Sequence, residues 1–417
     1  MPRGLAALRY PNFRLYWFGQ IVSLVGTWMQ SVSQPWLVLL LGGSALQLGI
    51  VVALQFTPAM LLAPLGGVIA DRVDKRRLLM VTQSVAMLQA VIFTILAALH
   101  VVQIWEVMLL ALGLGMVNAL DMPVRQAFAA DLVRREDLMN AIALNSASFN
   151  LARVIGPAIA GVTLAFFGPA FNFGANAVSY LAVLLALARM DVTAISRVAT
   201  LAGISVRASL AEGIRYAVRT PLVLWPLVLL GGMSIFAFNF QTLLPLFARN
   251  TLHLDEGGFG ALFAAMGFGS LIGSMALAFV GARRPLLRLI LGGAIGFVSF
   301  EVALGLSRSP FAVYPSIMLL GLASMLMVNT INVTVQHNVP DELRGRVMAL
   351  YVTVFAGATP IGGFFAGGVA QLWGAPAGFL LGAGLGAVVL VVVAWQLLVM
   401  GKAWTDASAR PGPASAK

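Results

Sequence analysis

The sequence predicts an all-α polytopic membrane protein, in which twelve transmembrane helices form two pseudo-symmetric six-helix halves. Three observations carry this fold class. First, 60% of the 417 residues are hydrophobic and only 10% are charged, whereas a soluble protein carries about 25% charged residues. Second, the apolar residues fall into twelve runs of membrane-spanning length. Third, polar residues recur at a near-constant offset in the two halves of the chain.

Each apolar run approaches or exceeds the length of about 20 residues that crosses a bilayer as a helix. Turn-forming residues separate many of the runs, as at Gly42-Gly43-Ser44 and Gly168-Pro169. The predicted spans are residues 15–41, 46–70, 77–99, 104–127, 139–165, 170–189, 222–248, 258–281, 286–306, 311–336, 345–371 and 376–400.

The cations predict the orientation of these spans. If the chain starts inside, 23 of the 26 Lys and Arg residues lie in cytoplasmic segments; Arg249 and Arg308 lie outside, and Arg153 lies within a helix. Because cytoplasmic loops are enriched in Lys and Arg, both termini are predicted to be cytoplasmic. The net charge of +11 therefore reflects topology. Nucleic acid is not expected as a partner, because the cations form short clusters and no basic domain.

Composition also excludes several chemistries. The chain has no Cys, so thiol catalysis, thiolate metal sites and disulfides are excluded. Its three His residues are far apart in the sequence and have no metalloprotease spacing. No Gly-x-x-x-x-Gly-Lys-Ser/Thr sequence occurs, which argues against an ATP-driven pump. We therefore expect no enzymatic activity, no cofactor and no bound metal.

The chain is predicted to divide into four parts. They are a first six-helix half (residues 1–190), a cytoplasmic central loop (191–221), a second six-helix half (222–401) and a cytoplasmic tail (402–417). Ser209 and Glu212 have the spacing of a capping box, which predicts a short amphipathic helix on the membrane surface. A shift of 207 residues places Gln34 on Gln241. Such parallel repeats are typical of transporters with a substrate site between the halves.

A polar stripe follows the first span. Its members fall within an arc of about 80° on a helix and are Gln20, Ser23, Thr27, Gln30 and Gln34. Unpaired amides are costly against lipid, so the stripe either lines a water-filled cavity or bonds to neighbouring helices. Because it runs along nearly the whole span, the cavity is favoured, and Gln30 and Gln34 are candidate cavity residues.

The fourth, seventh and tenth spans each also contain a set of polar residues. They are Asn118, Asp121 and Arg125; Asn239, Gln241 and Pro245; and Asn329, Asn332 and Gln336. Pro245 predicts a bend in its helix. Because the four marked spans are three apart in the chain, they are predicted to line one central path.

Three ionisable residues lie at or near the hydrocarbon region, where charges are costly and often functional. Arg153 is the deepest, about 20 Å along its helix. Its predicted partner is either Asp121, in a static ion pair, or an anionic substrate. Glu301 lies towards the outer end of the ninth span. It is either a carboxylate that reaches the membrane interface or a proton carrier.

The loop after the second span contains several charged residues and is predicted to lie at the cytoplasmic face of the membrane. Asp71 ends its helix, where a carboxylate is unfavourable, but the N-terminus of another helix stabilises a carboxylate. The eleventh span begins at the same face near Gly345, in the opposite half. Asp71 is therefore predicted to latch the halves together when the cytoplasmic side is closed. Lys75 or Arg76 is predicted to hold the loop against Asp131.

This latch predicts the effect of Asp71→Asn. The amide keeps the size of the side chain but loses the charge that a helix N-terminus attracts. We expect the variant to insert into the membrane and to lose transport, as measured by surface labelling and flux in the same cells. Wild-type flux in Asp71→Asn would exclude the latch.

The same loop resembles the signature of the major facilitator superfamily, Gly-x-x-x-Asp-Arg-x-Gly-Arg-Arg. The matching residues are Gly67, Asp71, Arg72, Lys75 and Arg76, with Asp74 where glycine is usual. The resemblance covers essentially the whole chain. It implies the fold of that superfamily and transport by alternating access, with the loop as a conformational gate.

Two further motifs resemble a branch of that superfamily. Gly156, Pro157 and Gly161 are similar to the Gly-Pro motif of drug/proton antiporters, with Ala160 in place of one glycine. The antiporters' usual arginine before Gly113 is absent. Residues 145–153, which include Asn150 and Arg153, and the pair Asp121 and Pro123 resemble the enterobactin-exporter and macrolide-efflux subgroup. That resemblance implies export of amphipathic compounds or siderophores from a bacterial cytoplasm across the inner membrane.

The sequence thus predicts a secondary active transporter that exports small amphipathic molecules by alternating access. By resemblance the coupling is proton antiport, with Asp121 and Glu301 as the acidic candidates. The expected partners are the lipid bilayer, a small-molecule substrate and protons, and the protein is expected to be monomeric. The alternatives are an importer or lysophospholipid translocator and, in a different class, a non-transporting receptor or scaffold.

Overall fold

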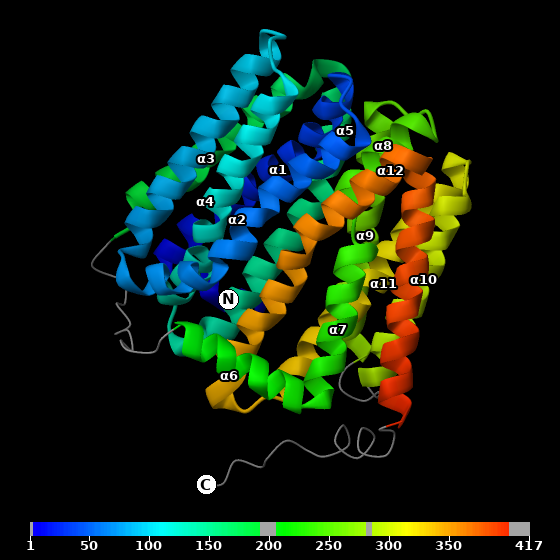
Figure 1. Ribbon diagram of the computed structural model, residues 1–417. Coiled ribbons are helices and arrows are strands. Elements are labelled where there is room, and N and C mark those ends of the chain that lie inside the picture. The colour runs from blue at the N-terminus through cyan, green and yellow to red at the C-terminus, as the bar shows by residue number, and fades with distance from the viewer. Residues whose placement is uncertain (1–2, 192–205, 281–285, 400–417) are drawn as a thin grey trace.

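The protein is an all-helical bundle (Figure 1). The computed structural model describes residues 3–191, 206–280 and 286–399. Within these ranges, side chains are described at all residues except 3–4, 63–72, 206–210, 278–280, 341 and 398–399. In chain order the elements are η1 (Arg3–Arg9), α1 (Pro11–Leu40), α2 (Ala45–Arg72), α3 (Lys75–Ala98), α4 (Ile104–Asp131), η2 (Arg135–Asp137), α5 (Leu138–Arg189), α6 (Val206–Arg219), α7 (Pro221–Phe236), α8 (Phe240–Asn250), α9 (Glu256–Val280), α10 (Leu286–Leu306), α11 (Pro310–His337) and α12 (Asp341–Val399).

Two of these helices are each a pair of crossings. α5 has 52 residues and α12 has 59, whereas about 20 residues cross a bilayer. Gly168 and Gly374 interrupt them with φ of +71° and +82°, a conformation that favours glycine. Each helix turns back there and forms two arms, as Figure 1 shows. With α7 and α8 as one crossing, the described helices make the twelve crossings that the sequence predicted.

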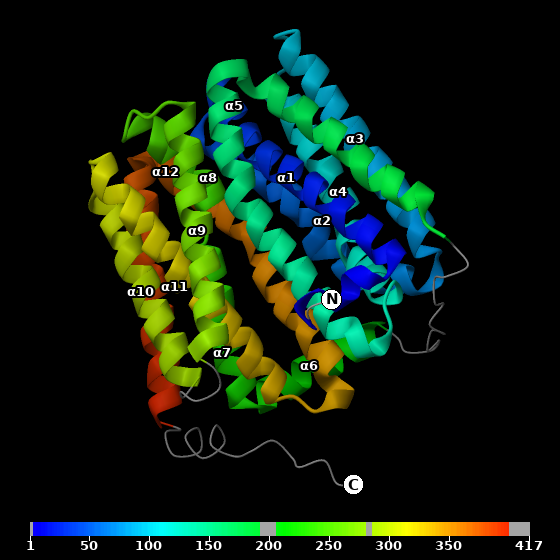
Figure 2. The same cartoon turned by 180° about the vertical axis from the view of Figure 1, so that it is seen from behind.

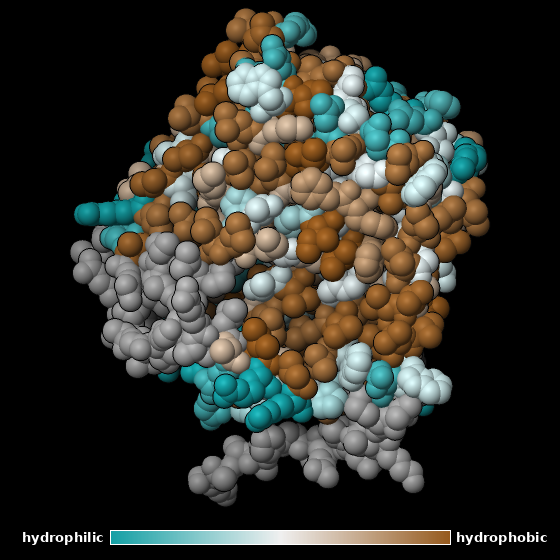
Figure 3. Space-filling model, viewed as in Figure 1, coloured by the Kyte–Doolittle hydropathy of each residue, from teal (hydrophilic) through white to brown (hydrophobic). Residues whose placement is uncertain are grey.

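Among the described crossings, α1 is the one without a strongly apolar stretch. Nine described stretches are long and apolar enough to cross a membrane. Two of them are the double-armed α5 and α12, and α1 is not among the nine. The reason is its polar stripe, which lowers the mean hydropathy although the helix has 30 residues. Brown, apolar residues cover much of the middle of the molecule, and polar residues gather mainly towards its edges (Figure 3).

Helices α1–α5 form one half of the bundle and α7–α12 the other (Figures 1 and 2). The main contacts between the halves join α2 to α12 and α5 to α9. Helix α6 lies across one end of the bundle, which we call the α6 face. The opposite end, with the turns at residues 42–44, 168 and 374, is called the far face.

The halves meet through glycines near the far face. A Cβ atom on Gly49 of α2 would lie 2.3 Å from the carbonyl oxygen of Gly363 in α12. In the second contact, a Cβ on Gly161 of α5 would lie 2.7 Å from Cα of Gly260 in α9. Such small residues let helix backbones approach closely within a membrane. The far-face parts of the two halves are therefore packed backbone against backbone.

Gly367→Val is expected to separate the halves at the far face. A Cβ on Gly367 would lie 2.9 Å from the Ala45 carbonyl oxygen, whereas a Cβ on the adjacent Gly368 meets no atom within 4 Å. Val52→Cys places a reporter at the buried contact in a chain that otherwise has no Cys. Maleimide labelling should rise severalfold in Gly367→Val and stay unchanged in Gly368→Val. Equal labelling in both variants would contradict this packing role.

Two local predictions were wrong. α6 begins at Val206, so Ser209 lies within the helix and is not its N-cap. The bend expected at Pro245 lies elsewhere, because α8 runs through that proline and the interruption falls between Phe236 and Phe240. There the side-chain amide of Asn239 donates to the carbonyl oxygen of Ile235 at 2.8 Å, which satisfies one carbonyl of the last turn of α7.

Candidate functional site

Two residues of the polar stripe of α1, Gln30 and Gln34, are hydrogen-bonded to neighbouring helices of the first half, whereas both side-chain polar atoms of Gln20 are buried without a partner. Gln30 donates to Gln89 of α3 at 3.2 Å and accepts from Asn176 of α5 at 2.7 Å. Gln34 donates to Gln55 of α2 at 3.2 Å. Both stripe residues are buried. These contacts belong to the interhelical alternative, and whether Gln30 and Gln34 also contact a substrate stays a prediction.

Asp121 of α4 is saturated with hydrogen bonds. Thr82 donates to Oδ1 at 2.7 Å and Gln83 donates to the same oxygen at 2.8 Å. The other oxygen, Oδ2, accepts from Nε of Arg125 at 2.8 Å and also from Nη2 of that guanidinium. Asp121 is only 2% exposed. Its ionic partner is therefore Arg125, one turn along the same helix, and the predicted pair with Arg153 is wrong.

Arg153 lies between the two halves, midway along the first arm of α5. Its Nη1 contacts the sulfur of Met325 in α11 at 3.5 Å. On the other side, its guanidinium carbon lies 6.0 Å from the ring centre of Trp28 in α1. Its Nε is buried and has no hydrogen-bond partner. Among the described residues, no carboxylate forms an ion pair with Arg153.

The remaining predicted cavity residues lie on four helices. Asn118 is half-buried on α4. Asn150 donates to the Ser146 carbonyl of its own helix. Asn329 donates to the hydroxyl of Ser274 in α9 at 3.1 Å, and Asn332 accepts from Gln336 at 2.6 Å. Gln241 is half-buried in the first turn of α8, next to Asn239. The predicted residues thus lie in both halves of the protein, and their shared role in one cavity stays a prediction.

Glu301 is a buried carboxyl group beside the interruption between α7 and α8. It is fully buried, and neither carboxyl oxygen has a hydrogen-bond donor. A Cβ on Gly382 of α12 would lie 3.3 Å from its Oε1 and 2.4 Å from the Phe236 carbonyl oxygen at the end of α7. One turn away, Phe297 packs against Phe238 in the interruption, with ring centres 4.7 Å apart. The alternative that Glu301 reaches the membrane interface does not match this burial.

The α2–α3 loop is tied to the ends of α4 and α5. The ion pair predicted with Asp131 is made by Lys75, at 2.6 Å. Arg76 instead donates to the carbonyl oxygens of Leu187 and Ala188, at 2.6 and 3.0 Å. Asp74 caps α3, because its side chain accepts from the backbone of Arg77 at 3.0 Å. The predicted gate residues Gly67, Asp71 and Arg72 lie outside the residues with described side chains.

The Gly-Pro motif of α5 lies at two helix contacts. A Cβ on Gly156 would lie 2.5 Å from Cβ of Trp28 in α1. The carbonyl oxygen of Pro157 and the backbone of Gly161 both face Gly260 of α9. The motif therefore lets α5 approach α1 within its own half and α9 in the other half. Gly156 lies one turn along α5 from Arg153, so this contact also brings Trp28 of α1 close to Arg153.

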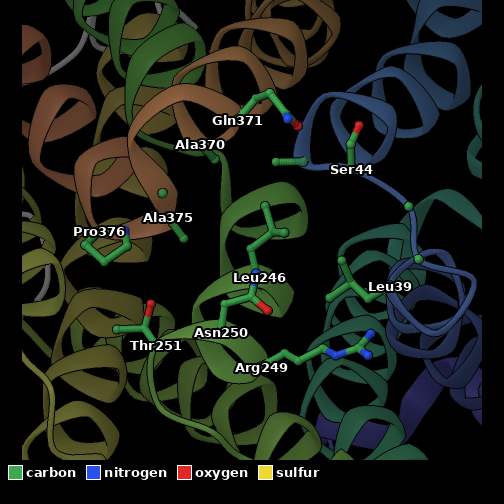
Figure 4. A pocket seen from close by; sticks show the side chains of 14 residues that line it. Leu39, Ser44, Leu246, Arg249, Asn250, Thr251, Ala370, Gln371, Ala375 and Pro376 are labelled. Atoms are coloured by element: carbon green, nitrogen blue, oxygen red, sulfur yellow. The ribbon is translucent and has the colours of Figure 1, made fainter.

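A pocket of about 540 Å³ opens at the far face between the halves. Figure 4 shows Ser44 and Leu39 from the first half across from Leu246, Asn250 and Gln371 of the second. Its lining residues are Leu39, Gly42, Gly43, Ser44, Ala45, Leu246, Arg249, Asn250, Thr251, Ala370, Gln371, Gly374, Ala375 and Pro376. None of the predicted cavity residues lines this pocket.

The residues that complete these sites carry weak sequence signals. Trp28 and Met325 are ordinary apolar residues, and Thr82 and Gln83 lie in a span whose other polar residues, such as Gln89, were not singled out in the sequence. Only the position of Asp74, directly before a helix, followed a readable rule, because Asp is a preferred N-cap residue. The remaining residues belong to these sites only because helices that are distant in the sequence pack together.

A family model described as transmembrane secretion effector, within the major facilitator superfamily, matches residues 3–414. The chain belongs to this family. It is 27% identical over 377 residues to the staphyloferrin A transporter of Staphylococcus aureus, covering 87% of this chain and 90% of that protein. It is 26% identical over 399 residues to the enterobactin exporter EntS of Shigella boydii, covering 94% and 92%. The family is one of transporters, and the chain is not an enzyme.

Solved structures support the fold alone. A mutant of the nucleoside transporter NupG superposes with a TM-score of 0.77 at 12% identity, covering 94% of this chain and all of that one (100%). A bacterial homologue of the lysosomal transporter Spinster, described as inward-facing and unoccupied, gives 0.69 at 14% identity, covering 98% and 97%. The fold predicted from the sequence is therefore confirmed, including its two six-helix halves.

Proposed function

We propose that this transporter is a secondary active exporter of small amphipathic molecules, including siderophore-like compounds, that works by alternating access. The observation that carries the proposal is the placement of Arg153, a cation without an ionic partner midway through the membrane, between two halves packed together near the far face. Transporter sites lie near the midplane between repeats. The names of the relatives, an enterobactin exporter and a staphyloferrin A transporter, support a siderophore-like substrate.

The orientation of the protein in the membrane is inferred from the charge pattern. The loops at the α6 face hold most of the cations, so this face is cytoplasmic under the positive-inside rule. The protein would then lie in a bacterial inner membrane with both termini in the cytoplasm, and it would act as a monomer. In the described conformation the glycine contacts hold the two halves together near the far face, next to the pocket that opens there. The loop that includes Lys75 and Asp71 acts as the gate on the cytoplasmic side.

We propose proton antiport as the coupling and Glu301 as the proton carrier. Asp121 is the weaker candidate, because four hydrogen bonds from Thr82, Gln83 and Arg125 occupy both of its carboxylate oxygens. Glu301 has no such donors, and an ionised carboxylate without a partner is costly in a membrane. A proton on Glu301 removes that cost, so binding and release of this proton can bias the conformation of α7, α8 and α10.

Reconstituted flux tests this function. Proteoliposomes are loaded with a panel of fluorescent amphipathic anions, cations and neutral compounds, and a pH gradient is imposed in either direction. Antiport predicts that substrate moves against the proton flow and that substrate flux moves protons in return. Absence of gradient-dependent flux for every compound would exclude proton antiport. Accumulation with the proton flow would favour the importer alternative.

A further inference from the structure

The surroundings of Arg153 show what kind of substrate the proposed exporter takes. A guanidinium carries five N–H donors in a planar fork. Only one contact to a described side-chain acceptor is formed, by Nη1 with the thioether of Met325 at 3.5 Å, and a thioether is a weak acceptor. The nearest acid on the polar spans, Asp121, is occupied by Arg125. Arg153 is half-buried, with a buried Nε, and a cation within the membrane that has no anion beside it is costly, so an anionic partner would stabilise this arrangement.

The walls beside Arg153 are aromatic and polarisable. Trp28 lies 6.0 Å from the guanidinium carbon, and Phe149 packs edge-on against Trp28 with ring centres 5.8 Å apart. Phe149 is 42% exposed, so other protein side chains do not fully cover this wall. Met325 supplies a flexible surface from the opposite half. Such a wall suits a ligand that carries a flat apolar group next to its acidic group.

The site draws on both halves of the protein. Trp28, Phe149 and Arg153 belong to α1 and α5, whereas Met325 belongs to α11. Helix α9 approaches the same point, because a Cβ on Gly267 would lie 2.6 Å from the carbonyl oxygen of Arg153. A ligand held here would therefore contact elements that move apart in alternating access. Binding at this point can bias the equilibrium between the two states.

We propose that Arg153, Trp28, Phe149 and Met325 form the binding site for a small aromatic anion, with the acidic group on Arg153 and the ring against Trp28. This inference rests on the proposed export function and names its substrate class. A carboxylate matches the planar guanidinium in a bidentate pair. Cations of the same shape are rejected, because they would meet the unpaired charge of Arg153.

Three ligands that share a naphthalene ring and carry head groups of different charge test this site. Calorimetry on the full chain in phosphatidylcholine nanodiscs compares 2-naphthoate, 2-naphthalenemethanol and 2-naphthylmethylammonium. We expect naphthoate to bind at least about tenfold more tightly than the ammonium compound, and Arg153→Gln to lose that preference. Arg153→Lys should retain part of it, because the charge stays but the bidentate geometry is lost. Arg308→Gln is the control, because Arg308 bonds to the carbonyls of Gly305 and Ser307 at the far face.

Three outcomes would overturn the site. One is equal binding of anion and cation by the wild type. Another is full naphthoate binding in folded Arg153→Gln. The third is naphthoate binding that disappears in phosphatidylglycerol nanodiscs, which would assign the anion to a lipid headgroup. Failure here differs from failure of export. Gradient-driven flux of cations that is unchanged in Arg153→Gln would support the export function and exclude the anion site. Charge-selective binding without any flux would support the anion site and exclude the export function.

Discussion

We expect Glu301→Gln to lose most of the transport driven by a pH gradient and to keep the exchange of substrate for substrate. Glutamine keeps the shape of the protonated side chain in the buried site beside Phe236 and Gly382, so the protein still folds and changes conformation. It cannot release a proton, so the gradient no longer drives net flux. We expect gradient-driven flux to fall to about a tenth or less of the wild-type rate, because an intramembrane carboxyl group is a typical proton relay.

Two flux assays on the same proteoliposomes separate these effects. Net accumulation is followed with and without a pH gradient, and exchange is followed with labelled substrate on one side and unlabelled substrate on the other. Glu136→Gln serves as the control, because Glu136 is 62% exposed and pairs with Arg9 at the surface. Undiminished gradient-driven flux in Glu301→Gln would remove Glu301 from the coupling mechanism. Loss of both net flux and exchange would instead indicate a structural role.

Asp121→Leu destabilises the first half more than any surface charge change. The substitution leaves the guanidinium of Arg125 without its partner and leaves Thr82 and Gln83 without their acceptor. Breaking one side of a buried ion pair costs about 3–5 kcal/mol. Arg125 is 24% exposed, so its guanidinium retains some contact with water or headgroups. We therefore expect the lower end of that range, with a clear fall in thermal stability in detergent.

The double variant Asp121→Leu/Arg125→Leu tests the mechanism of this loss. It removes both charges, so no unpaired guanidinium remains, and replacing a buried pair by apolar residues is often nearly neutral. We expect the double variant to be more stable than Asp121→Leu alone, as measured by unfolding temperature and monodisperse yield. Glu212→Gln, at the more exposed pair with Arg346, is the control. A double variant no more stable than the single one would show that the pair is not the source of stability.

Much of the architecture follows from local patterns in the chain. The crossings end within a few residues of the expected positions, because a bilayer of constant thickness requires apolar runs of constant length. The turns at Gly168 and Gly374 follow from glycine in front of a nearby proline, as the φ values of both glycines confirm. The contact of Lys75 with Asp131 follows from topology, because both residues end up at the same face.

The pairing inside the bundle does not follow from those patterns. Asp121 bonds to Arg125 rather than to Arg153, and the interruption falls at Phe238 rather than at Pro245. The pair of Asp121 with Arg125 joins residues four apart on one helix. Which helices meet Arg153 depends instead on how each helix is rotated about its axis, whereas hydropathy describes only how long a helix is and how apolar. The same rotation leaves Arg153 beside Trp28 and Met325 without an acid. The amino-acid sequence alone thus determines a twelve-helix transporter with its loops and faces, and helix packing determines which buried charges remain free to act.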